Sequence, residues 1–123
     1  MPEKEPARAW IARLFRTIDK QDAEGFCGFL ADDAVFIFAN SAPVAGVAAV
    51  RAAVDGFFKA VRALRHDIAD VWTLGDKIIC RGAATYTRHD GSTLTVPFAN
   101  VFGMRDDRVA HYQIYADVSA LWK

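Results

Sequence analysis

A change of hydrophobic period close to His66 divides the chain into two halves with different secondary structure. Before this point apolar residues recur every three or four positions, which is typical of amphipathic helices. After it they alternate with polar residues, which is typical of strands that bury one face. Helices with an apolar stripe followed by amphipathic strands favour an α+β domain, because the sheet covers the helix stripes.

The helical half predicts three helices. The first spans residues 7–20 and follows Pro6, a residue favoured at helix starts. Asp22 is suited to accept from the free amides of a second, shorter helix, which we expect to end near residues 32–33. The third helix carries the apolar stripe from Val50 to Leu64. Each helix therefore has one face that needs a partner.

Strands are predicted on both sides of the third helix. A short apolar run at 35–39 is a strand by composition, and residues 40–46 interrupt it with Ser, Pro and Gly. The second half gives four strands separated by turn signals at 75–76, 90–91 and 106–107. These runs are longer than the typical strand of about five to six residues, and long strands in a small sheet must curl.

We therefore expect residues 1–123 to form one domain. Its predicted architecture is α+β: a cone-shaped, strongly curved antiparallel sheet whose concave face is covered by three helices. Because the cone need not fill completely, an apolar pocket is expected inside it. The pocket is the feature of the predicted fold that bears on function.

The composition argues against several classes of partner. The chain has 15 basic and 15 acidic residues, which are spread along it, so nucleic acid and anionic membranes are disfavoured. The two cysteines are far apart, and no metal-ligand spacing or glycine-rich phosphate loop is present. We expect no metal and no nucleotide cofactor. The charged N-terminal residues and the lack of a long apolar run favour a cytoplasmic protein.

Four features of the sequence carry a family resemblance: FLADDAV at 29–35, Gly46 before the third helix, VPFAN at 96–100 and YQIYAD at 112–117. Through them the chain resembles the nuclear transport factor 2-like superfamily, whose members have a cystatin-like α+β roll. Within the superfamily the chain is most similar to the SnoaL-like and ketosteroid isomerase-like branch. The resemblance covers nearly the whole chain and implies a pocket. It does not imply one function, because the superfamily includes isomerases, cyclases, hydrolases and non-catalytic proteins.

The family's catalytic carboxylates are not matched in this sequence. The base of ketosteroid isomerases falls on Phe38, and their oxyanion-hole tyrosine and aspartic acid fall on Leu14 and Asn100. The water-holding tyrosine, asparagine and aspartate of limonene epoxide hydrolases fall on Phe38, Asn40 and Ile114. The acid/base aspartate of SnoaL-type cyclases also falls on Ile114. Whether the protein is an enzyme is therefore open at this stage.

Three residues are the candidate catalytic groups. His66 is the candidate acid or base, because imidazole exchanges protons near neutral pH, although a structural hydrogen bonder is the alternative. Asn100, in the middle of a strand, offers an amide to a carbonyl or oxyanion. Tyr112 offers a phenol, or packs with its hydroxyl at the cavity rim.

The predicted binding residues follow from strand alternation and from the family register. Alternation places Phe36 and Phe38 beside Asn40, and Phe98 beside Asn100, while the family register turns Thr85 and Ile114 inward. The alternative for Asn40 is a structural role, in which its side chain caps the adjacent turn. The candidate binding set is Phe36, Phe38, Asn40, Thr85, Phe98 and Ile114.

Two further predictions concern the outer face and the end of the last strand. In the family register Tyr86 and Arg88 lie on the outer face with Cys80, Gly82 and Ala84, a surface that homologous folds use for dimer contacts. We therefore expect a homodimer. Asp117 is interpreted as the cap of a short terminal turn, with a site role in reserve.

Two functions remain open. One is an isomerase- or cyclase-type enzyme that moves a proton on a small apolar compound with a carbonyl or hydroxyl group. The other is a non-catalytic, dimeric module of the same fold that binds a small ligand or a protein. Replacing His66 separates them, because only the enzyme depends on a proton-transfer group.

Overall fold

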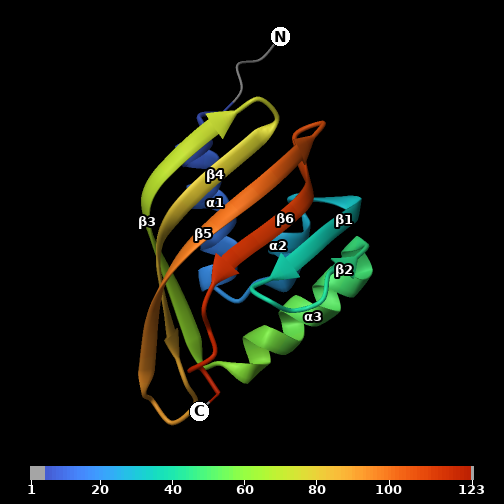
Figure 1. Cartoon of the computed structure of the whole chain (residues 1–123). Helices are drawn as coiled ribbons and strands as arrows, with labels where there is room; N and C mark the ends of the chain where they lie inside the picture. The colour runs from blue at the N-terminus through green and yellow to red at the C-terminus, as the bar shows by residue number, and fades with distance from the viewer. Residues whose placement is uncertain (1–4, 123) are drawn as a thin grey trace.

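Three helices lie on one side of a curled six-stranded sheet in the computed structural model, which describes residues 5–122 (Figure 1). The elements, in chain order, are α1 Ala7–Asp19, α2 Ala23–Cys27, β1 Leu30–Phe38, β2 Val44–Ala45, α3 Val47–Ala60, β3 Ala63–Leu74, β4 Lys77–Thr87, β5 Thr93–Arg105 and β6 Arg108–Ala116. The sheet is not closed into a barrel, and the predicted α+β class is confirmed. Among the described residues no helix has the length and apolar character needed to cross a bilayer.

The sheet order is β2-β1-β6-β5-β4-β3. Strands β3 to β6 form the predicted antiparallel meander, with turns at the three predicted places. Strand β1 pairs with β6 in parallel, which adds one parallel pair to a sheet expected to be antiparallel. The register joins Phe36 to Tyr112 and Phe38 to Ile114, so these four side chains share one face of the sheet.

Helix α1 lies across the concave side of the sheet, where Figure 1 shows it behind the strands. Its buried stripe of Trp10, Ile11, Leu14, Phe15 and Ile18 packs on the inner faces of the strands. Pro6 precedes its first residue, as predicted. Apolar burial at about 25 cal/mol per Å² is the main contribution that holds this helix in place.

Helix α2 and strand β1 depart from the predicted bounds. Asp22 caps α2 as expected, because its Oδ1 accepts from the amide of Gly25 at 2.9 Å. The helix, however, ends at Cys27 rather than near residues 32–33. The chain is extended from Leu30 because that residue already pairs with Val109 of β6. Strand pairing outweighs the local helix signal there.

Helix α3 ends at Ala60, so the stripe that runs to Leu64 belongs to two elements. Val61 has φ −122° and ψ 152°, which is extended backbone. Leu64 is buried from strand β3 instead of from the helix. The link brings the chain directly from α3 to the edge of the sheet where His66 lies.

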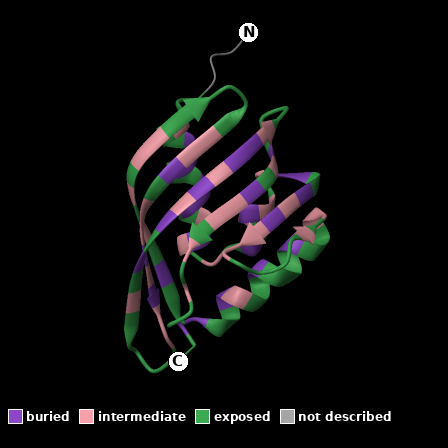
Figure 2. Cartoon of the chain, viewed as in Figure 1, coloured by how far each residue is buried: buried purple, intermediate pink, exposed green. Residues whose placement is uncertain are grey.

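Alternating burial along the long strands separates a concave and a convex face (Figure 2). On β5 the buried residues Val96, Phe98, Asn100 and Phe102 alternate with residues that are exposed or half-buried. The concave face and the helices therefore enclose the core between them.

Candidate functional site

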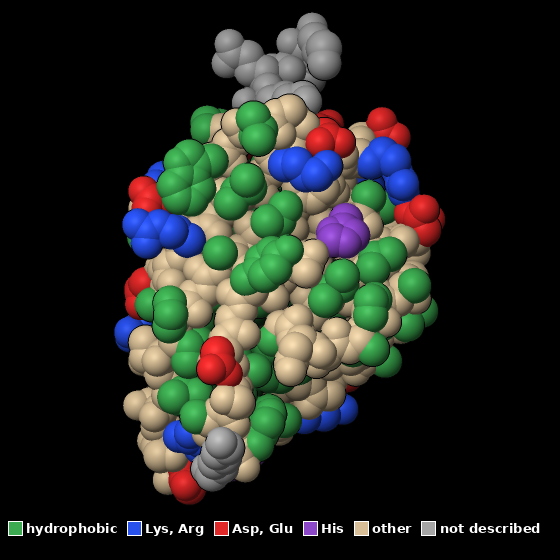
Figure 3. All heavy atoms as spheres, in the orientation of Figure 1, with side chains coloured by type: hydrophobic (Ala, Val, Ile, Leu, Met, Phe, Trp, Pro, Cys, Tyr) green, Lys and Arg blue, Asp and Glu red, His purple; other side chains and the backbone are tan. Residues whose placement is uncertain are grey.

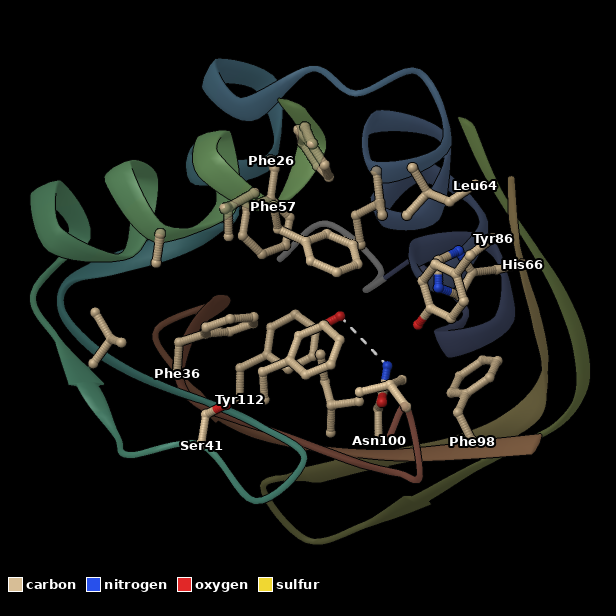
Figure 4. A pocket seen from close by; sticks show the side chains of 18 of the residues that line it. Phe26, Phe36, Ser41, Phe57, Leu64, His66, Tyr86, Phe98, Asn100 and Tyr112 are labelled. Atoms are coloured by element: carbon tan, nitrogen blue, oxygen red, sulfur yellow. Dashed lines mark hydrogen bonds between the residues drawn. The ribbon is translucent and has the colours of Figure 1, made fainter. Parts of the chain in front are cut away.

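A cavity of about 280 Å³ lies between the concave face and the helices (Figure 4). Phe26 of α2, Phe36 of β1 and Phe57 of α3 contribute to one wall, and residues from β3, β4 and β5 to the other. No Lys, Arg, Asp or Glu among the described residues lines it. Its volume is at the small end of the range for ligand sites, and its lining suits a small, uncharged molecule.

Aromatic rings form a continuous layer over the β1 and α3 side of the cavity. The rings of Phe36 and Tyr112 meet edge to face with centroids 5.2 Å apart. Those of Phe38 and Phe57 are 5.1 Å apart, and Phe57 contacts Tyr86 at 5.8 Å. Edge-to-face pairs of this kind contribute roughly 0.5–1.5 kcal/mol beyond area burial. This wall is therefore rigid and apolar.

His66 lines the cavity from β3 and is held by Asp19 at the end of α1. The Nδ1 atom of its imidazole lies 2.7 Å from Oδ1 of Asp19. The backbone amide of His66 donates to the other carboxylate oxygen at 3.1 Å. One carboxylate thus fixes both the main chain and the ring of His66. The side chain of His66 is 9% exposed and that of Asp19 is 27% exposed.

The bond to Asp19 determines which nitrogen of His66 is free. A carboxylate only accepts hydrogen bonds, so Nδ1 must carry a proton and donate. In the neutral ring Nε2 then has the lone pair that can take a proton. Phe15 lies against the ring at 4.6 Å and Phe98 meets it edge-on at 5.3 Å, which limits ring rotation. The contacts therefore fix both the tautomer and the orientation of the imidazole ring.

Asn100 is the buried polar residue of the concave face, with 1% of its surface exposed. Its Nδ2 donates to the hydroxyl of Tyr112 at 3.4 Å, near the limit for a hydrogen bond. Its Oδ1 has no hydrogen-bond partner among the described residues. An unpaired buried acceptor costs roughly 1–3 kcal/mol, so Asn100 contributes an unsatisfied polar atom to the enclosed wall of the cavity.

Burial raises the pKa values of both phenols that face the cavity. Tyr112 is 1% exposed, and desolvation, with smaller contributions from Cys80 and Tyr86, raises its pKa well above the ordinary value. Desolvation alone raises the pKa of Tyr86 to about 12. Both side chains therefore remain protonated at neutral pH and can act as hydrogen-bond donors.

The structure brings most of the predicted site residues to this one cavity. Those that line it are His66, Asn100, Tyr112, Phe36, Phe38, Phe98 and Ile114. They come from four strands that are distant in sequence, and the sheet register places them on the same face. Figure 4 shows His66, Asn100 and Tyr112 around the same space.

Asn40 and Asp117 lie outside the cavity lining. Asn40 is exposed in the turn after β1, and Ser41 and Ala42 of the same loop line the cavity instead. The positive φ of Ala39, 53°, turns the chain at the end of the strand, so the alternation used to place Asn40 stops there. Asp117 is exposed and accepts from the amide of Ser119 at 3.0 Å, in line with its predicted turn role.

Thr85 and Tyr86 face opposite to the predicted directions. The Thr85 hydroxyl bonds to that of Thr95 at 3.0 Å, and neither residue lines the cavity. Tyr86 is 3% exposed and lines it, together with the buried Ala84 and Cys80 on the same strand face. The family register was therefore applied to β4 one residue out of phase, which exchanges the two faces of a strand.

Asp19 and Tyr86 are the site residues that sequence reasoning missed. For Tyr86 a signal existed, because Cys80, Ala84 and Tyr86 are the less polar set of a strand whose other set holds Arg81 and Thr85. Asp19 gives no such signal. It lies 47 residues before His66, and the packing of α1 on β3 brings the two together.

Several solved structures share this fold. The chain resembles TerC co-crystallised with polyporic acid, with 18% identity, a TM-score of 0.83 and 96% coverage of each chain. It also resembles an epoxide hydrolase of the LEH type from M. tuberculosis, with 15% identity, a TM-score of 0.79 and coverage of 94% and 86%. At these identities the likeness shows the fold alone.

A third similar structure is described as a SnoaL-like polyketide cyclase from Jannaschia sp. CCS1, with 17% identity, a TM-score of 0.76 and coverage of 99% and 95%. No curated protein sequence gives a match. The model of the SnoaL-like domain, however, matches residues 11–112, which is most of the chain. The protein therefore belongs to the SnoaL-like domain family.

Proposed function

We propose that this protein is a proton-transfer enzyme of isomerase or cyclase type, which acts on a small, uncharged compound bearing a carbonyl or hydroxyl group. The observation that carries the proposal is the Asp19–His66 pair at the edge of an uncharged cavity. The pair supplies a base where the family's catalytic carboxylates are replaced by Phe38 and Ile114.

In the proposed reaction Nε2 of His66 removes a proton from the carbon next to the substrate carbonyl. The C–H electron pair forms the new carbon–carbon double bond of an enol or enolate, and the carbonyl π electrons move to oxygen. Asp19 stabilises the imidazolium through the Nδ1 bond. In a β,γ-unsaturated compound this intermediate is a dienolate, and the imidazolium returns the proton to the γ-carbon. The electrons on oxygen re-form the carbonyl and the double bond moves to the α,β position, which completes an isomerisation and restores neutral His66.

The aromatic wall supports this chemistry by keeping water away from the enolate. Phe36, Phe38 and Phe98 contribute to an apolar lining, in which hydrogen bonds and charges act more strongly than in water. An amide or phenol that faces the same space can stabilise the developing oxyanion by a few kcal/mol. Asn100 is placed for this role if its amide turns toward a bound carbonyl.

Deuterium exchange on a small ketone tests the proposal without knowledge of the natural substrate. We would follow the loss of α-proton NMR signals from 1-tetralone in D₂O with the wild-type protein, His66→Gln and Asp19→Asn. General-base catalysis predicts a loss of at least ~100-fold in His66→Gln. A smaller loss, about 10-fold or more, is expected in Asp19→Asn because the ring loses its fixed tautomer.

The same assay separates the proposal from its main competitor, a non-catalytic ligand-binding protein of the same fold. If tetralone binds but exchanges no faster with the wild-type protein than with His66→Gln, the proton-transfer function is refuted. Binding that is weakened by Phe38→Asp would then support a protein that only holds a ligand, since a charge in the apolar lining is costly to bury.

A further inference from the structure

Tyr86 places an unpaired hydroxyl in the cavity. The residue is 3% exposed and lines the site, and Figure 4 shows its hydroxyl pointing into the cavity. No described residue within 5–122 forms a hydrogen bond with it. The hydroxyl oxygen is accessible from the cavity, whereas Oδ1 of Asn100 is fully enclosed. The hydroxyl is therefore available as a hydrogen-bond donor to a partner that enters the cavity.

Tyr112, the phenol expected to contact a carbonyl, is less suited to do so. Its hydroxyl already accepts from Asn100, and its ring is packed against Phe36 and Phe102 at 5.2 and 4.4 Å. With 1% of its surface exposed, it forms part of the core as much as of the cavity wall. The hydroxyl of Tyr86, in contrast, has no hydrogen-bond partner among the described residues that would hold it in another direction.

Sheet register places Tyr86 beside the proposed base. Leu64 pairs with Tyr86 and His66 pairs with Ala84, so His66 and Tyr86 are diagonal neighbours on one face of β3 and β4. Diagonal neighbours on one face have backbone positions about 7–8 Å apart, so long side chains at the two positions can reach the same small ligand. A carbonyl compound bound there would turn its oxygen toward the phenol and the adjacent C–H toward the imidazole.

We infer that Tyr86 is the residue that recognises the ligand, by donating its hydroxyl proton in a hydrogen bond to a carbonyl oxygen. The ligand class is then narrowed to neutral ketones or aldehydes that carry a C–H next to the carbonyl. The inference rests on the proposed function for the cavity as the ligand site and for the C–H that His66 would deprotonate, whereas the hydrogen bond from Tyr86 does not depend on that reaction. The high pKa of the buried phenol, about 12, keeps the donor protonated over the physiological range.

A matched pair of probes measures this hydrogen bond directly. 1-Tetralone and tetralin share a bicyclic skeleton and differ by the carbonyl oxygen. We would measure the affinity of both for the wild-type protein and for Tyr86→Phe, which removes only an unpaired oxygen. Tetralone should bind about 3- to 10-fold more weakly to Tyr86→Phe, while tetralin binding stays unchanged. The carbonyl stretch of bound tetralone should also lose its hydrogen-bond shift in infrared spectra.

Two control variants locate the effect. Thr85→Val changes the adjacent residue on the outer face and should leave both affinities and the carbonyl band unchanged. If Tyr112→Phe, rather than Tyr86→Phe, removes the band shift, Tyr112 is the donor and the inference is wrong. An unchanged affinity and band in Tyr86→Phe overturns it as well.

The outcome is independent of catalysis. If tetralone binding depends on Tyr86 but deuterium exchange does not depend on His66, recognition by Tyr86 stands and the proton-transfer function fails. If exchange depends on His66 while Tyr86→Phe has no effect on binding, the proton-transfer function stands and recognition by Tyr86 fails. Failure of tetralone to bind at all would overturn the assignment of the cavity as a site for ketones.

Discussion

The concave and convex faces of the same strands differ in which groups lack a partner. Within residues 5–122 the concave face has polar atoms without hydrogen bonds, and the convex face has exposed aromatic rings. On the concave face, Oδ1 of Asn100 is buried without a hydrogen-bond partner among the described residues, and the Tyr86 hydroxyl opens onto the cavity. On the convex face charged groups are paired, as in the 2.7 Å contact of Arg81 with Asp70, while Trp72 and Tyr115 remain about half exposed. Exposed aromatic side chains on the convex face are the kind of surface that protein partners cover.

The convex apolar surface follows the sheet register. Trp72 of β3 pairs with Ile79 of β4, which pairs with Val101 of β5. Figure 3, drawn from the side on which the strands lie in front of the helices, shows hydrophobic side chains gathered over them. We propose that a second copy of the chain covers this surface. The net charge of zero imposes no overall repulsion between two copies, and an isologous dimer needs only one self-complementary patch.

Stability should distinguish the two faces most strongly. Phe102 is fully buried on the concave face and contacts Trp10 and Tyr112, so Phe102→Ala should lower the free energy of unfolding by about 3–5 kcal/mol. The adjacent convex residue gives the matched control, and Val101→Ala should cost far less in the monomer. Urea unfolding of both variants measures the difference. Equal losses would contradict the assignment of the two faces.

The location of the dimer interface gives the next largest effect. Trp72→Glu places a charge at the centre of the proposed contact and should weaken self-association at least ~30-fold, as expected for a buried tryptophan hot spot. Sedimentation equilibrium measures the dissociation constant. A charge on the exposed surface of helix α3, Ala49→Glu, serves as the control. A wild-type protein that is monomeric at all accessible concentrations would refute the dimer.

Hydrophobic periodicity predicted the α+β class, and strand alternation with the family register predicted several of the strand residues that line the cavity, because burial on one face imposes a period of two along each long strand. The predictions for Asn40 and Thr85 failed for different reasons. Asn40 follows the last residue of β1, where the alternation ends. Thr85 was oriented by analogy with a family register, against the local pattern in which Cys80 and Ala84 mark the inner face.

The Asp19–His66 pair could not be predicted in the same way. His66 was a candidate from residue type and position alone, but nothing in a single sequence pairs it with a carboxylate 47 residues earlier. The contact depends on the angle at which α1 crosses β3, and this is set by the packing of side chains such as Phe15 against the sheet. The chemical type of each residue can be read from the sequence, whereas contacts between residues far apart in the chain depend on the tertiary structure.

The smallest expected effect is on the free energy of unfolding at alkaline pH. It tests whether the ionisable groups of the concave face are desolvated. Burial raises the pKa of Cys80 from 9.0 to about 12 and that of Tyr86 from 10.0 to about 12. The folded state thus keeps protons that the unfolded chain releases. Their stabilisation is complete below pH 9 and is lost progressively as the pH rises toward 12. Between these limits the free energy of unfolding should fall as the pH increases.

Tyr86→Phe isolates one of these groups, because it removes the phenol and leaves Cys80 in place. The variant should unfold with a shallower pH dependence above pH 10 and differ from the wild-type slope by about 1 kcal/mol per pH unit or less. Urea titrations from pH 8 to 11 provide the measurement. If the free energy of unfolding falls equally steeply with pH in both proteins, the Tyr86 hydroxyl is solvated in the folded state. The concave face is then not dry at the residue proposed to bind the ligand, and its contrast with the solvated convex face weakens.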